Sequence, residues 1–187
     1  MKYLIIGLGN PGVEYKNTRH NVGFKVLDVL VSKSDTSFTT SRYADIAKIK
    51  YKGRRLILLK PNTFMNLSGK AINYWMYKLK IEINNILIIS DDIALPFGEL
   101  RIRKKGSDGG HNGLKNINTV LGQSDYARLR FGIDNDFLKG KQSEYVLDNW
   151  TSEQMALLEE KIDKAVIIVK SYCTIGIDQT MNNLNGK

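Results

Sequence analysis

The chain has 187 residues, 42% of them hydrophobic and only 3 of them proline, a composition typical of one globular domain. This composition excludes intrinsic disorder as the main state of the chain. Lysine and arginine total 28 against 19 acidic residues, so the net charge is +9, and the partner is expected to be a polyanion: RNA, DNA or an anionic membrane surface.

Short apolar runs alternate along the chain with segments in which apolar residues recur at helical spacing. The predicted strands are 2–8, 46–51, 56–59, 86–89, 100–103 and 128–133, and the predicted helices begin near residues 21, 72, 114 and 151. Thr151 and Gln154 have the spacing of a capping box at the start of the last helix.

Two features predict antiparallel pairing within this alternating pattern. Residues 46–59 read as a hairpin about Gly53, and the link from Pro96 to Gly98 is short. We therefore predict a single α/β domain over residues 1–187, with a mixed, mostly parallel twisted sheet and helices on both faces.

No segment has the features of a membrane span or a signal peptide. The apolar stretches are far shorter than the ~20 residues of a span, and the first run ends at Gly9-Asn10-Pro11 without a cleavage pattern. The single cysteine, Cys173, falls in a mostly apolar predicted helix, where a core thiol is expected. We expect a reducing, cytoplasmic setting, because one cysteine permits no disulfide within the chain.

The first glycine cluster, Gly7-Leu8-Gly9-Asn10-Pro11-Gly12, follows a strand and fits the dinucleotide-binding pattern. In that motif a helix starts within the glycines and presents its N-terminus to a pyrophosphate. Here residues 13–19 are polar and lack apolar periodicity, so the helix starts too late. On pattern alone, a tight turn is at least as consistent as a cofactor site.

His20 and Asp91 are the strongest catalytic candidates. His20 stands at the start of the first helix, where the helix dipole disfavours the imidazolium form and leaves a neutral base. Asp91 ends a buried strand and can orient the ring of His20. If the strand that Asp91 ends lies parallel to the first strand, 2–8, the two strands lead to the same edge of the sheet. The loop 60–66 could reach this edge as well.

Structural alternatives exist for these polar residues. Asp91 and Asp92 can cap a turn, Asn62 and Asn66 can satisfy loop backbone, and His111 fits a structural histidine. No phosphate-binding loop, nucleophile turn or cluster of His and Cys at metal-ligand spacing is found. Asp91 with Asp92 could nevertheless hold Mg²⁺, so a metal-dependent nuclease is kept as an alternative.

Taken in order, several short blocks resemble the bacterial peptidyl-tRNA hydrolase family over nearly the whole chain. The blocks are Gly7-Leu8-Gly9-Asn10-Pro11-Gly12, Tyr15, Thr18-Arg19-His20-Asn21, Lys60 to Gly69, Asp91-Asp92 and Gly109-Gly110-His111-Asn112-Gly113. In that family the first glycine block is a substrate loop and binds no dinucleotide.

The resemblance implies hydrolysis of the ester that joins a peptide to tRNA, without metal or other cofactor. It implies that His20 activates water, that Asp91 stabilises the catalytic form of His20, and that Asn10 separates N-blocked from free aminoacyl esters. It also implies four tRNA-substrate contacts: Tyr15, Phe64, Asn66 and Asn112.

Basic residues fall where the family is also basic, and we assign them to tRNA phosphates against the alternative of a solvated charged face. They are Arg101, Arg103, Lys104, Lys105 and Arg130. The chain departs from the family pattern at Ser90, Ala94 and Ser107-Asp108. We expect a monomer that acts on tRNA, with no DNA or membrane partner; a basic RNA-binding module without catalysis is the third hypothesis.

Overall fold

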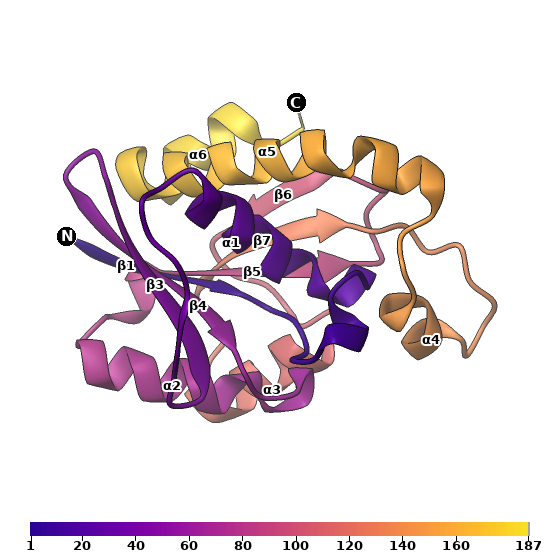
Figure 1. Cartoon of the computed structure of the whole chain (residues 1–187), viewed down its shortest axis with the longest axis horizontal. Helices are drawn as coiled ribbons and strands as arrows, with labels where there is room; N and C mark the ends of the chain where they lie inside the picture. Colours follow the sequence, from indigo (N-terminus) through magenta and orange to yellow (C-terminus); the bar gives the residue numbers. More distant parts are fainter. Residues whose placement is uncertain (187) are drawn as a thin grey trace.

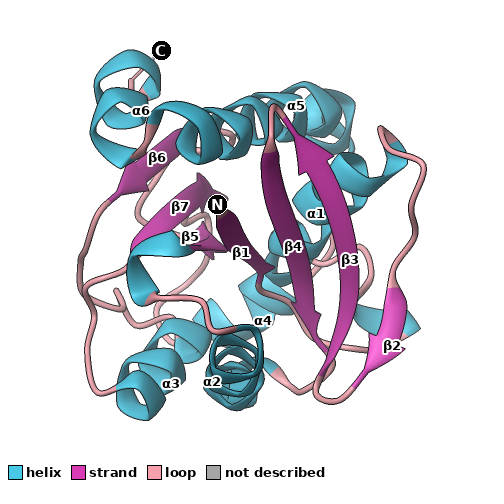
Figure 2. Cartoon of the chain, turned by 90° about the vertical axis from the view of Figure 1, so that its left-hand side faces the viewer, coloured by secondary structure: helices cyan, strands magenta, loops and turns pink. Residues whose placement is uncertain are grey.

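The computed structural model describes residues 1–186, and its centre is a seven-stranded mixed sheet in the order β2-β3-β4-β1-β5-β7-β6 (Figures 1 and 2). The strands are β1 (Lys2–Gly7), β2 (Thr39–Ser41), β3 (Ala44–Tyr51), β4 (Arg54–Pro61), β5 (Ile86–Asp92), β6 (Leu100–Arg103) and β7 (Ala127–Gly132). The four central strands β4, β1, β5 and β7 run parallel, while β2, β3 and β6 pair antiparallel at the edges.

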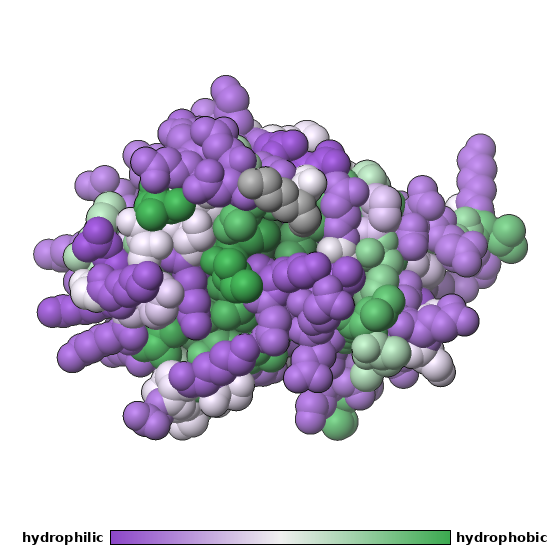
Figure 3. Space-filling view, turned by 90° about the horizontal axis from the view of Figure 1, so that it is seen from above, coloured by the Kyte–Doolittle hydropathy of each residue, from purple (hydrophilic) through white to green (hydrophobic). Residues whose placement is uncertain are grey.

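Helices cover both faces of this sheet (Figure 1). Seen from above, hydrophilic side chains cover most of the surface, with hydrophobic patches between them (Figure 3). The helices are α1 (Val22–Ser32), α2 (Ser68–Leu79), α3 (Asn112–Leu121), α4 (Gln142–Leu147), α5 (Ser152–Ile175) and α6 (Ile177–Leu184), with 3₁₀ turns η1 (Val13–Tyr15), η2 (Arg19–Asn21), η3 (Met65–Leu67) and η4 (Ile83–Asn85). The α/β fold with a mixed sheet and helices on both faces is therefore confirmed.

Each face of the sheet has its own hydrophobic core, because consecutive side chains of a strand point to opposite faces. Tyr3 and Ile5 of β1 pack into the core beneath α1 and α5, whereas Leu4 and Ile6 pack into the core beneath α2 and α3. The central strands are covered on both sides, which explains why they read as continuous apolar runs.

The predicted helix starts near residues 21 and 151 agree with the structure. The capping box of α5 is present: Thr151 Oγ1 accepts from the Gln154 amide at 3.2 Å, and Gln154 Oε1 accepts from the Thr151 amide at 3.1 Å. Three short elements, β2, α4 and α6, were not predicted, because they are too short for a clear hydrophobic period.

Cys173 lies in the core beneath α5 with 1% of its surface exposed, and burial raises the pKa of its thiol to about 12. A thiol of this kind stays protonated at neutral pH and packs as a small apolar group. Within the described residues, none of the helices combines the length and apolarity that a membrane span requires.

Candidate active site

Two glycines bring the start of α1 close to the end of β1. A Cβ atom added to Gly7 would lie 2.2 Å from the backbone oxygen of Gly23, and one added to Gly23 would lie 2.4 Å from the backbone nitrogen of Leu8. Strand and helix therefore pack backbone against backbone, a role that only glycine fills. The turn η1 and the late start of α1 at Val22 leave no helix N-terminus within the glycine block, which supports a packing role over dinucleotide binding.

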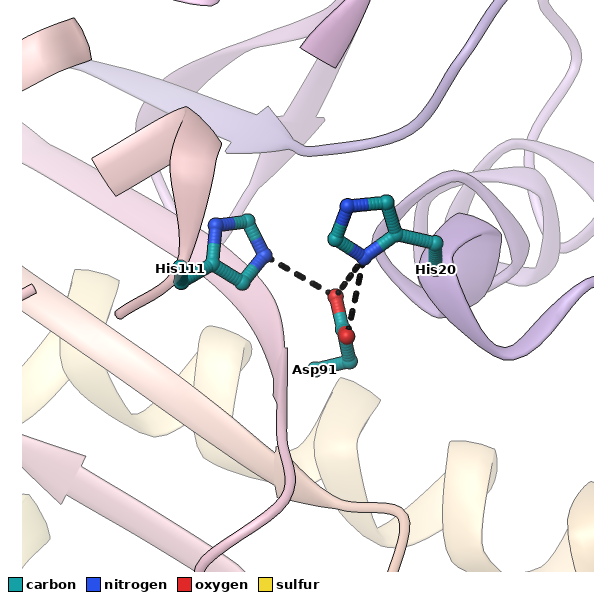
Figure 4. Close-up of side chains that lie close together, drawn as sticks. All are labelled: His20, Asp91 and His111. Carbon is teal, nitrogen blue, oxygen red and sulfur yellow. Dashed lines mark hydrogen bonds and ion pairs between the residues drawn. The ribbon is translucent and has the colours of Figure 1, made fainter. Parts of the chain in front are cut away.

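His20 and Asp91 are in direct contact. The Nδ1 atom of His20, in η2, lies 2.9 Å from both carboxylate oxygens of Asp91, near the end of β5 (Figure 4). The contact arises because β1 and β5 are parallel neighbours, with Gly7 in register with Ile89, so both chains leave the sheet at the same edge. Both side chains are buried.

His111 is a second partner of Asp91. On the sequence alone, a structural histidine is one reasonable interpretation of His111. Its Nε2 atom lies 3.0 Å from Asp91 Oδ1. Its Nδ1 atom accepts hydrogen bonds from the backbone amides of Gly113 at 3.1 Å and Leu114 at 3.3 Å, so the side chain caps α3. An Nδ1 that accepts must be unprotonated, hence Nε2 carries the proton and donates to Asp91.

The charge of Asp91 determines which ring nitrogen of His20 faces it with a proton. Burial alone would raise the pKa of this carboxyl, but His20 and His111 outweigh burial and hold it well below its usual range. Asp91 is therefore ionised and accepts the Nδ1 proton of His20. In the neutral ring of His20, the Nε2 atom then keeps its lone pair. This Nε2 atom points away from Asp91, and no described residue forms a hydrogen bond with it (Figure 4).

The donor chemistry of this cluster fits hydrogen bonding better than metal binding. One possible ligand atom from each of His20, Asp91 and His111 lies within 4.8 Å of the other two. The Nε2 atom of His111 carries a proton, because Nδ1 is committed to the helix cap, so it has no lone pair for a metal. Asp92, the second carboxylate of the nuclease alternative, instead pairs with Arg130 and accepts from the Ala94 amide at 2.8 Å.

Asn10 is held rigidly beside this cluster. Its backbone exchanges two hydrogen bonds with the side chain of Asn21, at 2.8 and 2.9 Å, and its Oδ1 accepts from the Met65 amide at 2.7 Å. With Oδ1 occupied, the Nδ2 group of Asn10 is left to donate elsewhere, and no described residue accepts from it. Asn10 also ties the loop before α2 to the first glycine block.

Arg19 is a buried residue that the sequence analysis did not single out. It donates to the backbone oxygen of Tyr145 at 3.1 Å and to Gln154 Oε1 at 3.3 Å, and its guanidinium lies 4.2 Å from the Tyr145 ring centroid. These contacts fix η2, and with it His20, against α4 and α5. The signal in the sequence was weak, because an arginine beside polar residues usually lies on the surface.

A small cavity of about 50 Å³ opens beside the histidines. It is lined by His20, Asp91, His111, the glycine loop 108–110 and the α4 residues Gln142, Ser143 and Val146, among others. Its size is that of one or two water molecules.

The predicted substrate contacts lie in the turns η1 and η3, just before η3, and at the start of α3. Phe64 and Asn66 are exposed beside Met65, the ring of Phe64 lies edge-on to Tyr15 with centroids 6.4 Å apart, and Asn112 is exposed directly after His111. Among the described residues, no hydrogen bond engages the side-chain amides of Asn66 and Asn112, which leaves them available to a ligand.

Three of the predicted basic residues, Arg101, Arg103 and Arg130, share one face of β6 and β7. Lys104 follows β6 and pairs with Asp178 at 2.8 Å. Arg101 stands opposite Arg130, and Arg103 opposite Arg128. Arg101 pairs with Glu99 and Arg130 with Asp92, whereas Arg103 has no carboxylate partner among the described residues. Partial burial and the nearby charges of Arg101 and Arg130 lower the pKa of Arg103.

Arg128 has a structural role on the same face. It is buried, and it donates to the backbone oxygens of Ser107 at 2.7 Å and Ser124 at 2.8 Å. The bond to Ser107 holds the loop that leads to His111. Arg128 was not among the predicted phosphate contacts, and a side chain as buried as this one is not available to a phosphate.

An α/β fold with a buried histidine–aspartate pair, an unengaged imidazole nitrogen and flanking amide side chains is typical of an enzyme that uses acid–base catalysis. The family model for peptidyl-tRNA hydrolase matches residues 4–187. The chain therefore belongs to the peptidyl-tRNA hydrolase family.

Similar proteins agree with this assignment. A peptidyl-tRNA hydrolase from Bacteroides fragilis is 57% identical over 187 residues and another from Porphyromonas gingivalis is 53% identical over 185, with 100% and 99% of this chain and 100% of each relative covered. The crystal structure of peptidyl-tRNA hydrolase from Acinetobacter baumannii superimposes with a TM-score of 0.92 at 33% identity, covering 98% of this chain and 94% of that one.

Proposed function

We propose that this protein hydrolyses the ester between a peptide and the terminal ribose of tRNA, releasing the peptide and intact tRNA. The observation that carries the proposal is the geometry of His20, whose Nδ1 is held by Asp91 at 2.9 Å while its Nε2 faces away from the carboxylate. A histidine in this state is a general base, and the family relationship supplies the class of substrate.

The reaction requires one proton acceptor. His20 Nε2 takes a proton from water, and the hydroxide attacks the ester carbonyl carbon to form a tetrahedral oxyanion. Asp91 stabilises the imidazolium that forms. Collapse of the intermediate breaks the bond to the ribose oxygen, which receives the proton from His20, so that water is divided between the peptide acid and the tRNA hydroxyl.

Side-chain amides complete the site in this proposal. Asn66 and Asn112 donate to the peptide or to the developing oxyanion, which needs donors in place before the charge forms. The free Nδ2 of Asn10 donates to the acyl amide that distinguishes a peptidyl ester from a free aminoacyl ester. Tyr15 and Phe64 contact the substrate end of tRNA.

The protein acts without a metal ion in this proposal. An ester is already activated, so one oriented base and a few amide donors are sufficient. We expect the enzyme to act as a monomer in the cytoplasm, with Arg101, Arg103 and Arg130 facing tRNA phosphates and with no part for DNA or a membrane.

The deciding experiment identifies the product. Incubation with an N-acylated aminoacyl-tRNA should release an N-acyl amino acid and full-length tRNA, with the same rate in excess chelator. Shortened RNA would identify a nuclease, binding without any product would identify an RNA-binding module, and loss of activity in chelator would contradict the metal-free mechanism.

A further inference from the structure

The basic charge of the chain is concentrated in one segment. Residues 46–81 contain nine lysines and arginines and not one aspartate or glutamate. This segment forms β3, β4 and α2, and it lies apart in sequence from the arginines of β6 and β7. In the sheet it occupies the side towards β2, whereas β6 is the opposite edge (Figure 2).

One face of α2, within this segment, and the turn before β3, which precedes the segment, combine cations with aromatic rings. We call this set the basic aromatic patch: Arg42, Tyr43, Lys70, Tyr74, Tyr77 and Lys78. The α2 members recur at helical spacing and so share one side of the helix. Tyr77 is 88% exposed, and Lys70 and Lys78 are exposed as well.

Cations and rings of the patch are in contact with one another. The Arg42 guanidinium lies 5.0 Å from the Tyr43 ring centroid, and the Lys70 ammonium lies 4.6 Å from the same centroid. The Lys78 ammonium lies 5.5 Å from the Tyr74 ring centroid. These rings hold the cations in place without neutralising them.

No carboxylate among the described residues forms an ion pair with Arg42, Lys70 or Lys78. Six of the described lysines form ion pairs elsewhere on the surface, among them Lys33 with Asp163 and Lys164 with Glu160. The hydrogen bond from Arg42 and the charge of Lys70 lower the pKa of Tyr43, as expected where positive charge is unbalanced.

The patch is continuous with the loop that carries the proposed substrate contacts. The Asn62 amide donates to the Tyr43 backbone oxygen at 3.0 Å, and the Asn62 side chain donates to the Ser41 backbone oxygen at 3.3 Å. From Asn62 the chain runs through Phe64 and Asn66 directly into α2. A ligand that reaches past Asn66 therefore meets the patch next.

We propose that the basic aromatic patch is a second RNA-binding surface, which contacts the sugar-phosphate backbone of the tRNA on the side of the active site opposite β6. Lys70, Lys78 and Arg42 neutralise phosphates, and the exposed ring of Tyr77 offers a stacking face to a base. Unpaired cations beside exposed rings are the combination that RNA backbones and unpaired bases recognise. This inference rests on the proposed function, since it extends the binding of the same substrate.

The test compares binding of full-length tRNA as a function of salt, in a His20→Asn background that prevents turnover. Lys70→Ala with Lys78→Ala should weaken binding and flatten the plot of log affinity against log salt by about two, one for each lost phosphate contact. The matched control is Lys33→Ala with Lys164→Ala, which changes the net charge equally on the opposite face of the sheet and should leave the slope unchanged. All four side chains are exposed, so folding is expected to persist, and urea unfolding verifies it.

In the enzyme with His20 intact, the patch variant should raise KM for peptidyl-tRNA and leave kcat unchanged. An unchanged slope and KM would overturn the patch proposal alone, provided that the parent enzyme cleaves peptidyl-tRNA. A parent that binds tRNA but cleaves no peptidyl ester would overturn the proposed function, whatever the slopes of the variants show. An equal loss of slope in the control pair would show that only net charge matters and would also contradict a localised surface.

Discussion

Asp91 and His111 are joined by a hydrogen bond of 3.0 Å that links the end of β5 to the cap of α3. Replacing His111 by alanine should remove both the cap and the second donor to Asp91. We expect the free energy of unfolding to fall by about 1 kcal/mol, the usual cost of losing an N-cap, together with a drop in turnover. His111→Asn is the matched variant, because asparagine caps helices well but is too short to hold Asp91 in the same way. If His111→Asn restores both stability and turnover, the bond to Asp91 has no catalytic consequence.

His20→Asn should abolish most hydrolysis of peptidyl-tRNA while tRNA binding remains close to that of the parent. Asparagine keeps a polar side chain at this buried position but cannot accept the proton of water. Loss of a general base typically lowers turnover by ~100- to 10,000-fold. The measurement is single-turnover hydrolysis alongside tRNA binding, and near-normal turnover in the variant would remove His20 from the mechanism.

Asp91→Asn should lower turnover by up to about 10,000-fold, as when the orienting aspartate of a serine-protease triad is replaced by asparagine. The acid limb of the pH–rate profile should also move to lower pH, because the imidazolium of His20 loses the negative charge that stabilises it. A profile unchanged in height and position would show that Asp91 does not act through His20.

The same carboxylate should make folding sensitive to acid. In the folded protein the pKa of Asp91 lies well below its usual range, whereas the unfolded chain restores it to about 3.9. A lowered folded pKa gives stability that is fully present above the unfolded pKa and is lost as pH falls through the folded pKa. Urea unfolding from pH 7 towards pH 2 should therefore show a steeper loss of stability in the parent than in Asp91→Asn, and parallel curves would contradict this coupling.

Asn10→Ala and Asn10→Asp should reduce the discrimination between N-acylated and free aminoacyl-tRNA. Neither substitute can donate the amide hydrogen bond that Asn10 Nδ2 is free to make. The ratio of kcat/KM for the two substrates gives the answer directly. A ratio equal to that of the parent would assign Asn10 only to the loop contact with Met65.

Arg103→Ala should weaken binding of all tRNAs alike and reduce the salt slope of log affinity by about one. Arg101→Ala should have a smaller effect, since Arg101 already pairs with Glu99 while Arg103 has no carboxylate partner among the described residues. Equal slopes for the parent and Arg103→Ala would make this face a solvated surface rather than a phosphate contact.

Local patterns in the sequence were sufficient for most of the fold. Hydrophobic periodicity predicted six of the strands and four of the longer helices, because a strand or helix buried on a defined face repeats its apolar residues at a fixed interval. The positions of His20 and Asp91 at element ends predicted their contact on the condition that the two strands lie parallel. The structure meets this condition, because β1 and β5 are parallel neighbours that end at one edge of the sheet.

Only the tertiary structure decided how the polar side chains share their partners. His111 and Asp91 are 20 residues apart, and Arg19 and Gln154 are 135 apart, so no local pattern could pair them. The structure likewise commits Arg101 and Arg130 to carboxylates and leaves Arg103 without one. Periodicity reports which face of an element is buried, whereas hydrogen bonds and ion pairs depend on where distant elements place individual atoms within about 3 Å of one another.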